Sequence, residues 1–321
     1  EQGRRGSAPY CGFASATEGS DWIVQCARRE NKRPLYILVW GGLEDVAQAL
    51  HDAPDIQSKI RIYWIGGPNK KWSINSYTYI VQNFPDLWFI ENNASYRGFI
   101  YQSKINDQYN ALYYDTYIKD AGYLGKDFAH YYKGNPKLGD TPALLYMMDG
   151  DPDNPAKESW GGSFDLCTHS PRSVFYRPVT AKDTVQVYSI IEFHVAGPVR
   201  NDIPIDSACI TLTIGKQKWG GYHIGNGDYV VRHSTYYLGT LPYTITSNIP
   251  EFPNQEGEIT VENIWPGRIR DTDYIVGNKW FTDKSASEYF WKNYQGAQTI
   301  YKWRNAVMED WGKRWEWLKK E

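Results

Sequence analysis

Two short apolar segments near the start of the chain are separated by a stretch with helical spacing. Residues 35–40 and 60–65 are almost wholly apolar, and a pair of glycines follows each of them. Apolar runs of this length are typical of strands that are buried on both faces, as in a parallel sheet. Between them, residues 43–50 place apolar side chains on one helical stripe, and Pro54 ends that pattern. This order predicts a βαβ unit.

The segments on either side of this unit continue the pattern. Downstream, the sequence predicts a helix over residues 76–83 and a strand over residues 87–90. Upstream, residues 17–21 precede a helical pattern that starts at Trp22. Ser20 is a favourable N-cap there, because its side-chain oxygen can accept from the unpaired amides of a first helical turn. The first part of the chain is therefore expected to alternate helices and strands.

The hydrophobic period changes to two after residue 183. Apolar and polar residues alternate in several short segments, and residues 225–228 read Gly-Asn-Gly-Asp, a strong hairpin signal. Short strands at close spacing predict a β-sandwich over residues 183–266. Beyond it, residues 300–318 carry apolar side chains every three or four positions, which predicts an amphipathic helix that covers a core.

Composition narrows the classes of function. The 321 residues include 35 basic and 37 acidic side chains, so no basic field exists to hold nucleic-acid phosphates. No apolar run reaches the roughly 18 residues that a membrane span needs. The 14 tryptophans and 26 tyrosines offer flat faces that suit sugar rings. We therefore expect a polysaccharide or oligosaccharide partner, with no nucleic acid and no membrane.

Common metal and nucleophile motifs are absent from the sequence. The six histidines form no H-x-x-x-H or H-E-x-x-H pattern, the four cysteines have no C-x-x-C spacing, and Gly-x-Ser-x-Gly and P-loop motifs do not occur. Residues 149–154 begin like a calcium loop, but Asn154 and Trp160 stand where an EF-hand needs Gly and Glu. An acidic surface loop is favoured there. The sequence leaves open whether Cys167 and Cys209 form a disulfide.

Six motifs occur in the order seen in a known family. The stretch Tyr36–Gly67 resembles the centre of nucleoside hydrolases, where a strand, a glycine-containing turn, an Ala/Leu helix and a strand ending in paired glycines follow one another. The closer resemblance is to the nucleoside-hydrolase-like, cellulose-binding protein family of bacteria. The motifs that carry it are Glu18-Gly19-Ser20-Asp21-Trp22, Leu38-Val39-Trp40-Gly41-Gly42, Phe84-Pro85-Asp86-Leu87, Gly139-Asp140-Thr141-Pro142, Trp160-Gly161-Gly162 and the closing Gly296-Ala297…Trp303-Arg304…Asp310…Arg314-Trp315-Glu316-Trp317.

This resemblance implies an α/β fold with a nucleoside-hydrolase-like, partly parallel sheet flanked by helices and an inserted all-β sandwich. It divides the chain into an α/β domain over residues 1–182, the sandwich over residues 183–266 and a helical return to the α/β domain over residues 267–321. Nucleoside hydrolases carry a calcium-binding aspartate cluster on their first strand. Nothing before Glu18 supplies such a cluster, so we expect the first strands of the α/β domain to be missing from this chain.

The predicted sandwich has a resemblance of its own. Residues 220–232, 238–244 and 256–259 are similar to the small immunoglobulin-like module found ahead of several glycoside hydrolases.

Candidate substrate-binding residues follow the first apolar strand. Trp40, Gly41 and Gly42 lie at a strand's carboxyl end, where open α/β sheets bind ligands. The glycines would let a ligand approach the backbone, and Trp40 offers a stacking face. The alternative is that all three are turn and core residues. Trp160, which precedes another glycine pair, is the further substrate-binding candidate.

Three acidic residues are candidates for catalysis or metal binding. The resemblance places Glu18 and Asp21 where related hydrolases have a loop near the substrate, so they are candidates for acid–base roles or for holding sugar hydroxyls. The alternative is charge and capping at a helix start. The resemblance also implies that Asp140 is the last calcium ligand, whereas Asp before Thr141-Pro142 is also a standard helix N-cap. One carboxylate cannot hold calcium, which takes about 6–8 oxygens.

These expectations leave two functions open. The first is a glycosidase of polysaccharide degradation, with calcium as cofactor, in which carboxylates activate a metal-bound water that cleaves an N-glycosyl or O-glycosyl bond. The second is a non-catalytic protein that binds cellulose or another polysaccharide through its tryptophan and tyrosine faces. The family implies an extracellular or periplasmic location for either.

Overall fold

The chain divides by its internal contacts into two compact units. The structure is a computed structural model, and it describes residues 3–100, 112–132, 138–263 and 269–319. Unit 1 comprises Glu1–Glu91 with Leu166–Phe281, and unit 2 comprises Asn92–Asp165 with Thr282–Glu321. The boundary predicted between residues 266 and 267 lies outside the described residues.

Unit 1 contains the predicted βαβ unit. β1 (Leu35–Val39) and β2 (Ile60–Ile65) pair in parallel, and α2 (Glu44–Asp52) and the short turn η1 (Pro54–Lys59) connect them. The strands of this sheet follow the order β1-β2-β3-β15-β4. Its remaining members are β3 (Trp88–Asn92), β15 (Trp280–Asp283) and β4 (Phe164–Leu166). Strands from early and late parts of the chain therefore share one sheet, and the fold is the mixed α/β class expected.

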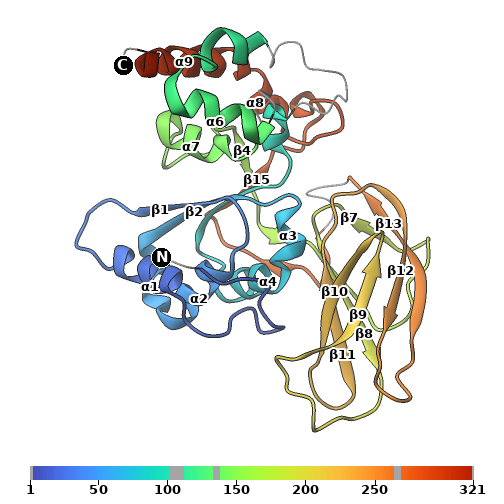
Figure 1. Ribbon diagram of the computed structural model, residues 1–321. Coiled ribbons are helices and arrows are strands. Elements are labelled where there is room, and N and C mark those ends of the chain that lie inside the picture. The colour runs from blue at the N-terminus through green and yellow to red at the C-terminus, as the bar shows by residue number, and fades with distance from the viewer. Residues whose placement is uncertain (1–2, 101–111, 133–137, 264–268, 320–321) are drawn as a thin grey trace. The chain divides into compact units, whose positions relative to one another are not determined.

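Helices cover one side of this sheet. Figure 1 shows α1 (Glu18–Ala27), α2 and α4 (Ile74–Asn83) on the same side of β1 and β2. The apolar stripe predicted over residues 43–50 forms the helical half of the core, where Leu50 and Trp64 are fully buried. A single turn, α3 (Asn69–Trp72), links β2 to α4.

β1 is less buried than its sequence suggested. Both apolar runs predicted strands buried on two faces, and β2 fits, because all its residues except Arg61 are buried. In β1, residues 35–38 are only partly buried. The reason is that β1 is the edge strand of the sheet and has a neighbour on one side alone.

Helix α1 begins one turn earlier than predicted. Thr17, and not Ser20, is the N-cap: Thr17 Oγ1 accepts from the Ser20 amide at 3.0 Å, and Ser20 Oγ accepts from the Thr17 amide at 2.9 Å. This reciprocal arrangement is a capping box, which satisfies two backbone amides at a helix start. Both residue types can cap, so the sequence alone did not distinguish them.

Eight further strands of unit 1 form one largely antiparallel sheet in the order β6-β8-β11-β10-β9-β12-β13-β7. They are β6 (Arg172–Phe175), β7 (Thr184–Gln186), β8 (Ile190–Ala196), β9 (Ala208–Ile214), β10 (Gln217–His223), β11 (Asp228–His233), β12 (Gly239–Thr246) and β13 (Gln255–Glu262). β5 (His169–Ser170) and β14 (Tyr274–Ile275) form a separate short pair.

This large sheet folds over into two packed layers. Phe193 of β8 and Tyr243 of β12 have ring centroids 5.0 Å apart, although β11, β10 and β9 separate their strands. Adjacent strands lie about 4.8 Å apart, so a flat sheet would hold these rings much further from each other. The predicted sandwich therefore forms among the described residues, from β7 to β13 with β6 added to it, while its predicted bounds 183–266 and an immunoglobulin-like arrangement stay predictions.

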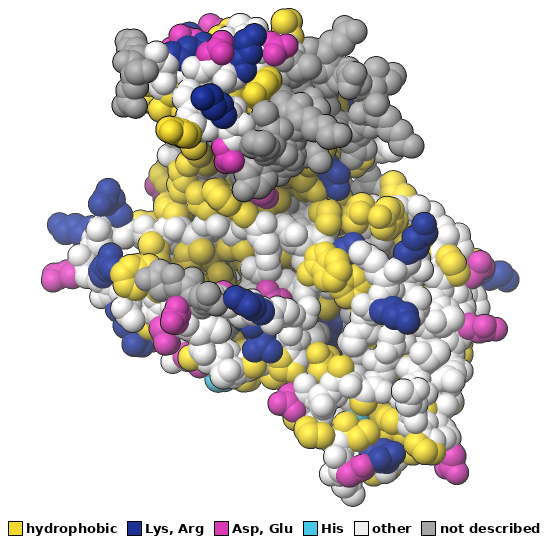
Figure 2. Space-filling view, in the orientation of Figure 1, with side chains coloured by type: hydrophobic (Ala, Val, Ile, Leu, Met, Phe, Trp, Pro, Cys, Tyr) yellow, Lys and Arg dark blue, Asp and Glu magenta, His cyan; other side chains and the backbone are white. Residues whose placement is uncertain are grey.

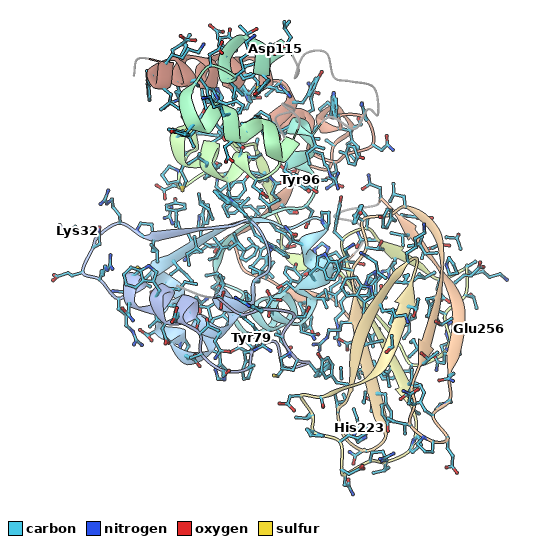
Figure 3. All side chains as sticks on the ribbon, viewed as in Figure 1. Lys32, Tyr79, Tyr96, Asp115, His223 and Glu256 are labelled. Carbon is cyan, nitrogen blue, oxygen red and sulfur yellow. The ribbon has the colours of Figure 1, made fainter. Side chains whose placement is uncertain are left out.

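The hairpin predicted from residues 225–228 joins β10 to β11. Gly225, Asn226 and Gly227 have positive φ angles of 108°, 51° and 74°, which glycine and asparagine adopt most easily. The Gly227 amide donates to His223 Nε2 at 3.2 Å, and Figure 3 shows His223 at this end of the sandwich.

Unit 2 is mainly helical. The stripe predicted as one helix over residues 300–318 is divided, because the Trp303 amide bonds to the Ile300 carbonyl, a three-residue step that tightens the chain. Its apolar side chains still form a core, in which Ile300 and Val307 pack with Phe99. The helical elements among the described residues of unit 2 are η2 (Ser95–Phe99), η3 (Tyr114–Ile118), α6 (Gly122–Tyr132), α7 (Thr141–Asp149), η4 (Ser287–Tyr289), α8 (Gln298–Tyr301), α9 (Arg304–Trp315) and η5 (Glu316–Lys319).

Candidate functional site

The predicted binding residues Trp40, Gly41 and Gly42 lie directly after β1, at the carboxyl edge of the parallel strand pair. The Trp40 side chain is 53% exposed. Gly41 borders open space, because a side-chain carbon placed there would meet no atom within 4 Å. An exposed aromatic face beside unobstructed backbone is the geometry that stacking of a sugar ring requires.

Hydrogen bonds from the neighbouring strand hold this turn in place. Trp64 Nε1 donates to the Gly41 carbonyl at 2.8 Å. Asn69 Nδ2 donates to the Ile65 carbonyl at 2.9 Å and to the Trp40 carbonyl at 3.4 Å, so one amide links the ends of both strands. The backbone around Trp40 is thereby fixed to the sheet, while its indole ring remains accessible to solvent.

A carboxylate that the sequence analysis missed lies beside this turn. Glu44 is the first residue of α2, and a side-chain carbon on Gly42 would come 1.9 Å from Glu44 Oε2. Burial raises the pKa of Glu44, although hydrogen bonds from its own backbone amide and from Ser73 oppose that shift. A raised carboxyl pKa is what a general acid needs. The only signal in the sequence was an acid just after a glycine pair, which also describes an ordinary helix start.

Glu18 and Asp21 lie in the first turn of α1, and both are exposed. The amino end of a helix carries partial positive charge, which stabilises carboxylates in its first turn. Thr17 Oγ1 also donates to Asp45 Oδ1 at 2.7 Å, so this end of α1 is tied to α2. The placement fits the helix-start alternative, and an acid–base role for either carboxylate stays a prediction.

Asp140 and Trp160 both belong to unit 2, whereas Trp40 belongs to unit 1. Asp140 occupies the N-cap position of α7, but its side chain makes no capping hydrogen bond. Burial raises the pKa of its carboxyl group. Trp160 is partly buried against the apolar cluster that contains Phe99 and Leu145. A cleft shared by Asp140 and Trp40 stays a prediction, as does substrate binding by Trp160.

The described residues do not fit a calcium site. Nowhere in the described part of the chain do three His, Cys, Asp or Glu side chains gather as metal ligands. Asp140 alone falls short of the about 6–8 oxygens that calcium takes. In the acidic loop 149–154, Asp151 accepts from two backbone amides of that loop and from Lys157 Nζ at 2.5 Å, so its oxygens serve the loop itself. Calcium stays a prediction of the family resemblance.

The cysteines form no disulfide, and the thiol of Cys167 is unreactive. All four are free, so the pairing of Cys167 with Cys209 that the sequence left open does not occur. Burial raises the pKa of Cys167 to about 12, which keeps its thiol protonated and unreactive.

A buried polar cluster in unit 1 was also missed. Glu91 of β3 is 1% exposed and accepts from Lys70 Nζ, from the Tyr77 hydroxyl at 2.7 Å and from Trp280 Nε1 at 3.0 Å. Lys70 also donates to the Tyr188 carbonyl at 2.8 Å. Trp280 is 189 positions from Glu91, so no short-range pattern could reveal the cluster. Because its members are buried, we interpret the cluster as structural.

Comparison with known proteins shows which family this sequence resembles. A family model described as "Cellulose-binding Sde182, nucleoside hydrolase-like domain" matches residues 2–164, half of the chain. No curated protein matches the chain. A solved nucleoside hydrolase-related hypothetical protein from Saccharophagus degradans, associated with carbohydrate metabolism, is 16% identical over 76% of this chain and 75% of its own, with a TM-score of 0.35.

A second solved structure is similar over a smaller part of the chain. It is a putative glycoside hydrolase from Bacteroides vulgatus, 20% identical over 26% of this chain and 17% of its own, with a TM-score of 0.21. The family match agrees with the motifs that bracket the α/β part of the sequence and with the parallel pair β1–β2. The chain belongs to the cellulose-binding Sde182 family, and residues 2–164 are its nucleoside hydrolase-like domain.

Proposed function

We propose that this chain is a polysaccharide-binding protein that holds sugar rings against Trp40. The observation that carries the proposal is the 53% exposed indole, fixed by its backbone at the carboxyl end of β1 beside the open Gly41. Membership of a cellulose-binding family supports a glucose polymer as the ligand. The near-neutral charge balance, with a net of −2, also suits an uncharged ligand.

An extracellular or periplasmic location is part of this proposal. Polysaccharides such as cellulose lie outside the cell, and the family name supports such a ligand. In the ranges that the structure describes, no helix combines the length and the apolar character needed to cross a bilayer.

Binding measurements on the full chain test the role of Trp40. Trp40→Ala is expected to weaken binding to insoluble cellulose and to soluble cello-oligosaccharides about tenfold, or about 1.4 kcal/mol, because the stacking face is lost. Trp40→Phe retains an aromatic face and should recover most of the affinity. Trp317→Ala removes a tryptophan that is 65% exposed in unit 2 and is the matched control. Unchanged binding by Trp40→Ala would contradict the proposal.

Glu44 supports a second function, hydrolysis of a glycosyl bond at the same edge. Its raised pKa suits protonation of a leaving oxygen, and the reaction also needs a second carboxylate, for which Glu18 and Asp21 are the predicted candidates. Nitrophenyl glycosides and nucleosides, assayed with and without calcium, test this function. If hydrolysis occurs, Glu44→Gln should lower it about 100-fold or more. A wild-type chain that binds polysaccharide but cleaves none of these substrates would leave binding as the function.

A further inference from the structure

A second group of aromatic side chains lies where α3 meets the sandwich, within unit 1. Trp72, the last residue of α3, is 49% exposed, and its ring centroid is 4.5 Å from that of Trp219 in β10. Lys71 Nζ lies 5.3 Å from the Trp72 ring and 5.8 Å from the Trp219 ring. Figure 2 shows hydrophobic side chains exposed in the region where α3 lies beside β10.

The group continues onto the segment that follows β11. Lys71 Nζ is 5.1 Å from the Tyr236 ring, and the Tyr236 and Tyr237 rings are 4.2 Å apart with their hydroxyls 2.8 Å from each other. Tyr237 is 54% exposed. Lys71 itself is only 6% exposed and donates to Gln217 Oε1 at 2.7 Å, so it is held in place among the rings. Lys71 therefore contacts the exposed Trp72 ring directly and the exposed Tyr237 ring through Tyr236.

An unpaired donor lies beneath the exposed rings. Trp219 is 8% exposed, and its Nε1 has no hydrogen-bond partner within the described part of the chain. The neighbouring His233 ring lies 5.3 Å from the Trp219 ring, and its Nδ1 is likewise unpaired among the described residues. Burial and the charge of Lys71 lower the pKa of His233 to about 3, so that ring is neutral at ordinary pH. Trp219 and His233 therefore form a buried, uncharged base beneath the exposed Trp72 ring.

The geometry points to a second polysaccharide-binding site formed by Trp72, Tyr237 and Trp219, with Lys71 as its positioning residue. Sugar rings would stack on Trp72 and Tyr237, while Trp219 supports the Trp72 ring from beneath. This inference rests on the proposed function, because the ligand is the same class of polymer. Two separate aromatic faces on one chain would bind a long polymer more tightly than either face alone.

Binding to cellohexaose and to insoluble cellulose, measured on the full chain, tests the second site. Trp72→Ala and Tyr237→Ala should each weaken binding about fivefold to tenfold. Trp72→Phe keeps an aromatic face against Trp219 and should bind within about twofold of the wild type. Trp317→Ala is again the control, and thermal unfolding checks that each variant is folded. Tyr237→Ala keeps the test valid if Trp72→Ala loosens α3.

The outcomes separate this site from the one at Trp40. The second site is overturned if Trp72→Ala and Tyr237→Ala bind like the wild type while Trp40→Ala loses binding. The proposed function then still stands. The reverse pattern supports the second site and overturns the role of Trp40. A wild-type chain that binds neither cellohexaose nor cellulose overturns both.

Discussion

Two buried carboxylates in unit 1 are almost equally hidden from solvent but are neutralised in different ways. Glu91 is 1% exposed and Glu192 is 0% exposed. Glu91 pairs with Lys70 and also accepts hydrogen bonds from a neutral hydroxyl and a neutral indole. Glu192 pairs with two cations, Arg232 at 2.6 Å and Arg172 at 2.5 Å.

The Glu192 cluster also extends to solvent through a histidine. His194 Nε2 lies 3.0 Å from Glu192 Oε1, and its Nδ1 lies 2.9 Å from Oδ2 of Asp228, whose side chain is 36% exposed. Burial by itself would lower the pKa of His194, but hydrogen bonds to the two carboxylates outweigh it and raise that pKa. Burial likewise opposes ionisation of Glu192, yet His194 and Arg232 lower the pKa of Glu192 to about 2.

The contrast shows how the same residue type can be stabilised by a lysine with neutral donors or by two arginines with a histidine. A carboxylate paired with a buried lysine depends on that partner, because removing either one leaves a buried charge without its counter-charge in a low dielectric. A carboxylate in a network keeps several partners, and a histidine at its edge makes part of the stability depend on pH. The Glu91 cluster should therefore respond more to mutation, and the Glu192 cluster more to pH.

Replacing Glu91 with Ala has the largest expected effect. Lys70 is 1% exposed and would lose the carboxylate that neutralises it, which costs about 3–5 kcal/mol. The Tyr77 hydroxyl and the Trp280 indole would lose their acceptor as well. Urea unfolding followed by circular dichroism measures the loss in the free energy of unfolding.

Combining Lys70→Met with Glu91→Leu is the matched control for that variant. The double variant removes both charges and fills their space with apolar groups, an exchange that is often nearly neutral for buried pairs. It should recover at least half of the stability that Glu91→Ala loses. A loss below about 1 kcal/mol in Glu91→Ala would contradict the dependence of buried Lys70 on Glu91.

Replacing Glu192 with Gln should lower the free energy of unfolding by a smaller amount, about 2–3 kcal/mol. Arg232 would keep its hydrogen bond to the Tyr10 carbonyl at 2.9 Å and its position 3.8 Å from the Tyr10 ring. Arg172 is 21% exposed, so water can replace part of what the carboxylate supplied. The same unfolding measurement applies, and a loss larger than that of Glu91→Ala would reverse the ranking.

The sequence predicted best those elements whose cause is local. The apolar run of β2 and the stripe of α2 follow from spacing alone, and both occur where they were expected. The turn at residues 225–228 formed because three consecutive positive φ angles need glycine or asparagine. The position of Trp40 also follows from local sequence, because the glycine pair after it ends the strand at Val39.

The elements that were missed depend on distant positions. β10 has two adjacent glycines and little alternation, and it becomes a strand because β9 and β11 pair with it on either side. The partners of Glu91 come from three separate segments, so no periodicity marks them. At the site, the raised pKa of Glu44 follows from burial that only the folded chain creates.

Replacing His194 with Gln should have the smallest effect, but it tests the pH part of the comparison directly. Because the pKa of His194 is raised above its ordinary value of 6.5, the folded chain binds this proton more tightly than the unfolded chain does. The stability that results is fully present below about pH 6.5 and is lost as the pH rises through the raised pKa. Glu192, with a pKa of about 2, stays ionised across this window and adds no slope.

The wild type should therefore lose about 1 kcal/mol more unfolding free energy between about pH 5.5 and about pH 8.5 than His194→Gln does. Urea unfolding at both pH values measures the difference. The Glu192→Gln variant should show a reduced slope as well, because the imidazolium would lose one of its two carboxylates. Equal slopes in the wild type and His194→Gln would mean that His194 does not make the stability of the Glu192 cluster depend on pH, and the predicted difference in pH response between the two clusters would then be wrong.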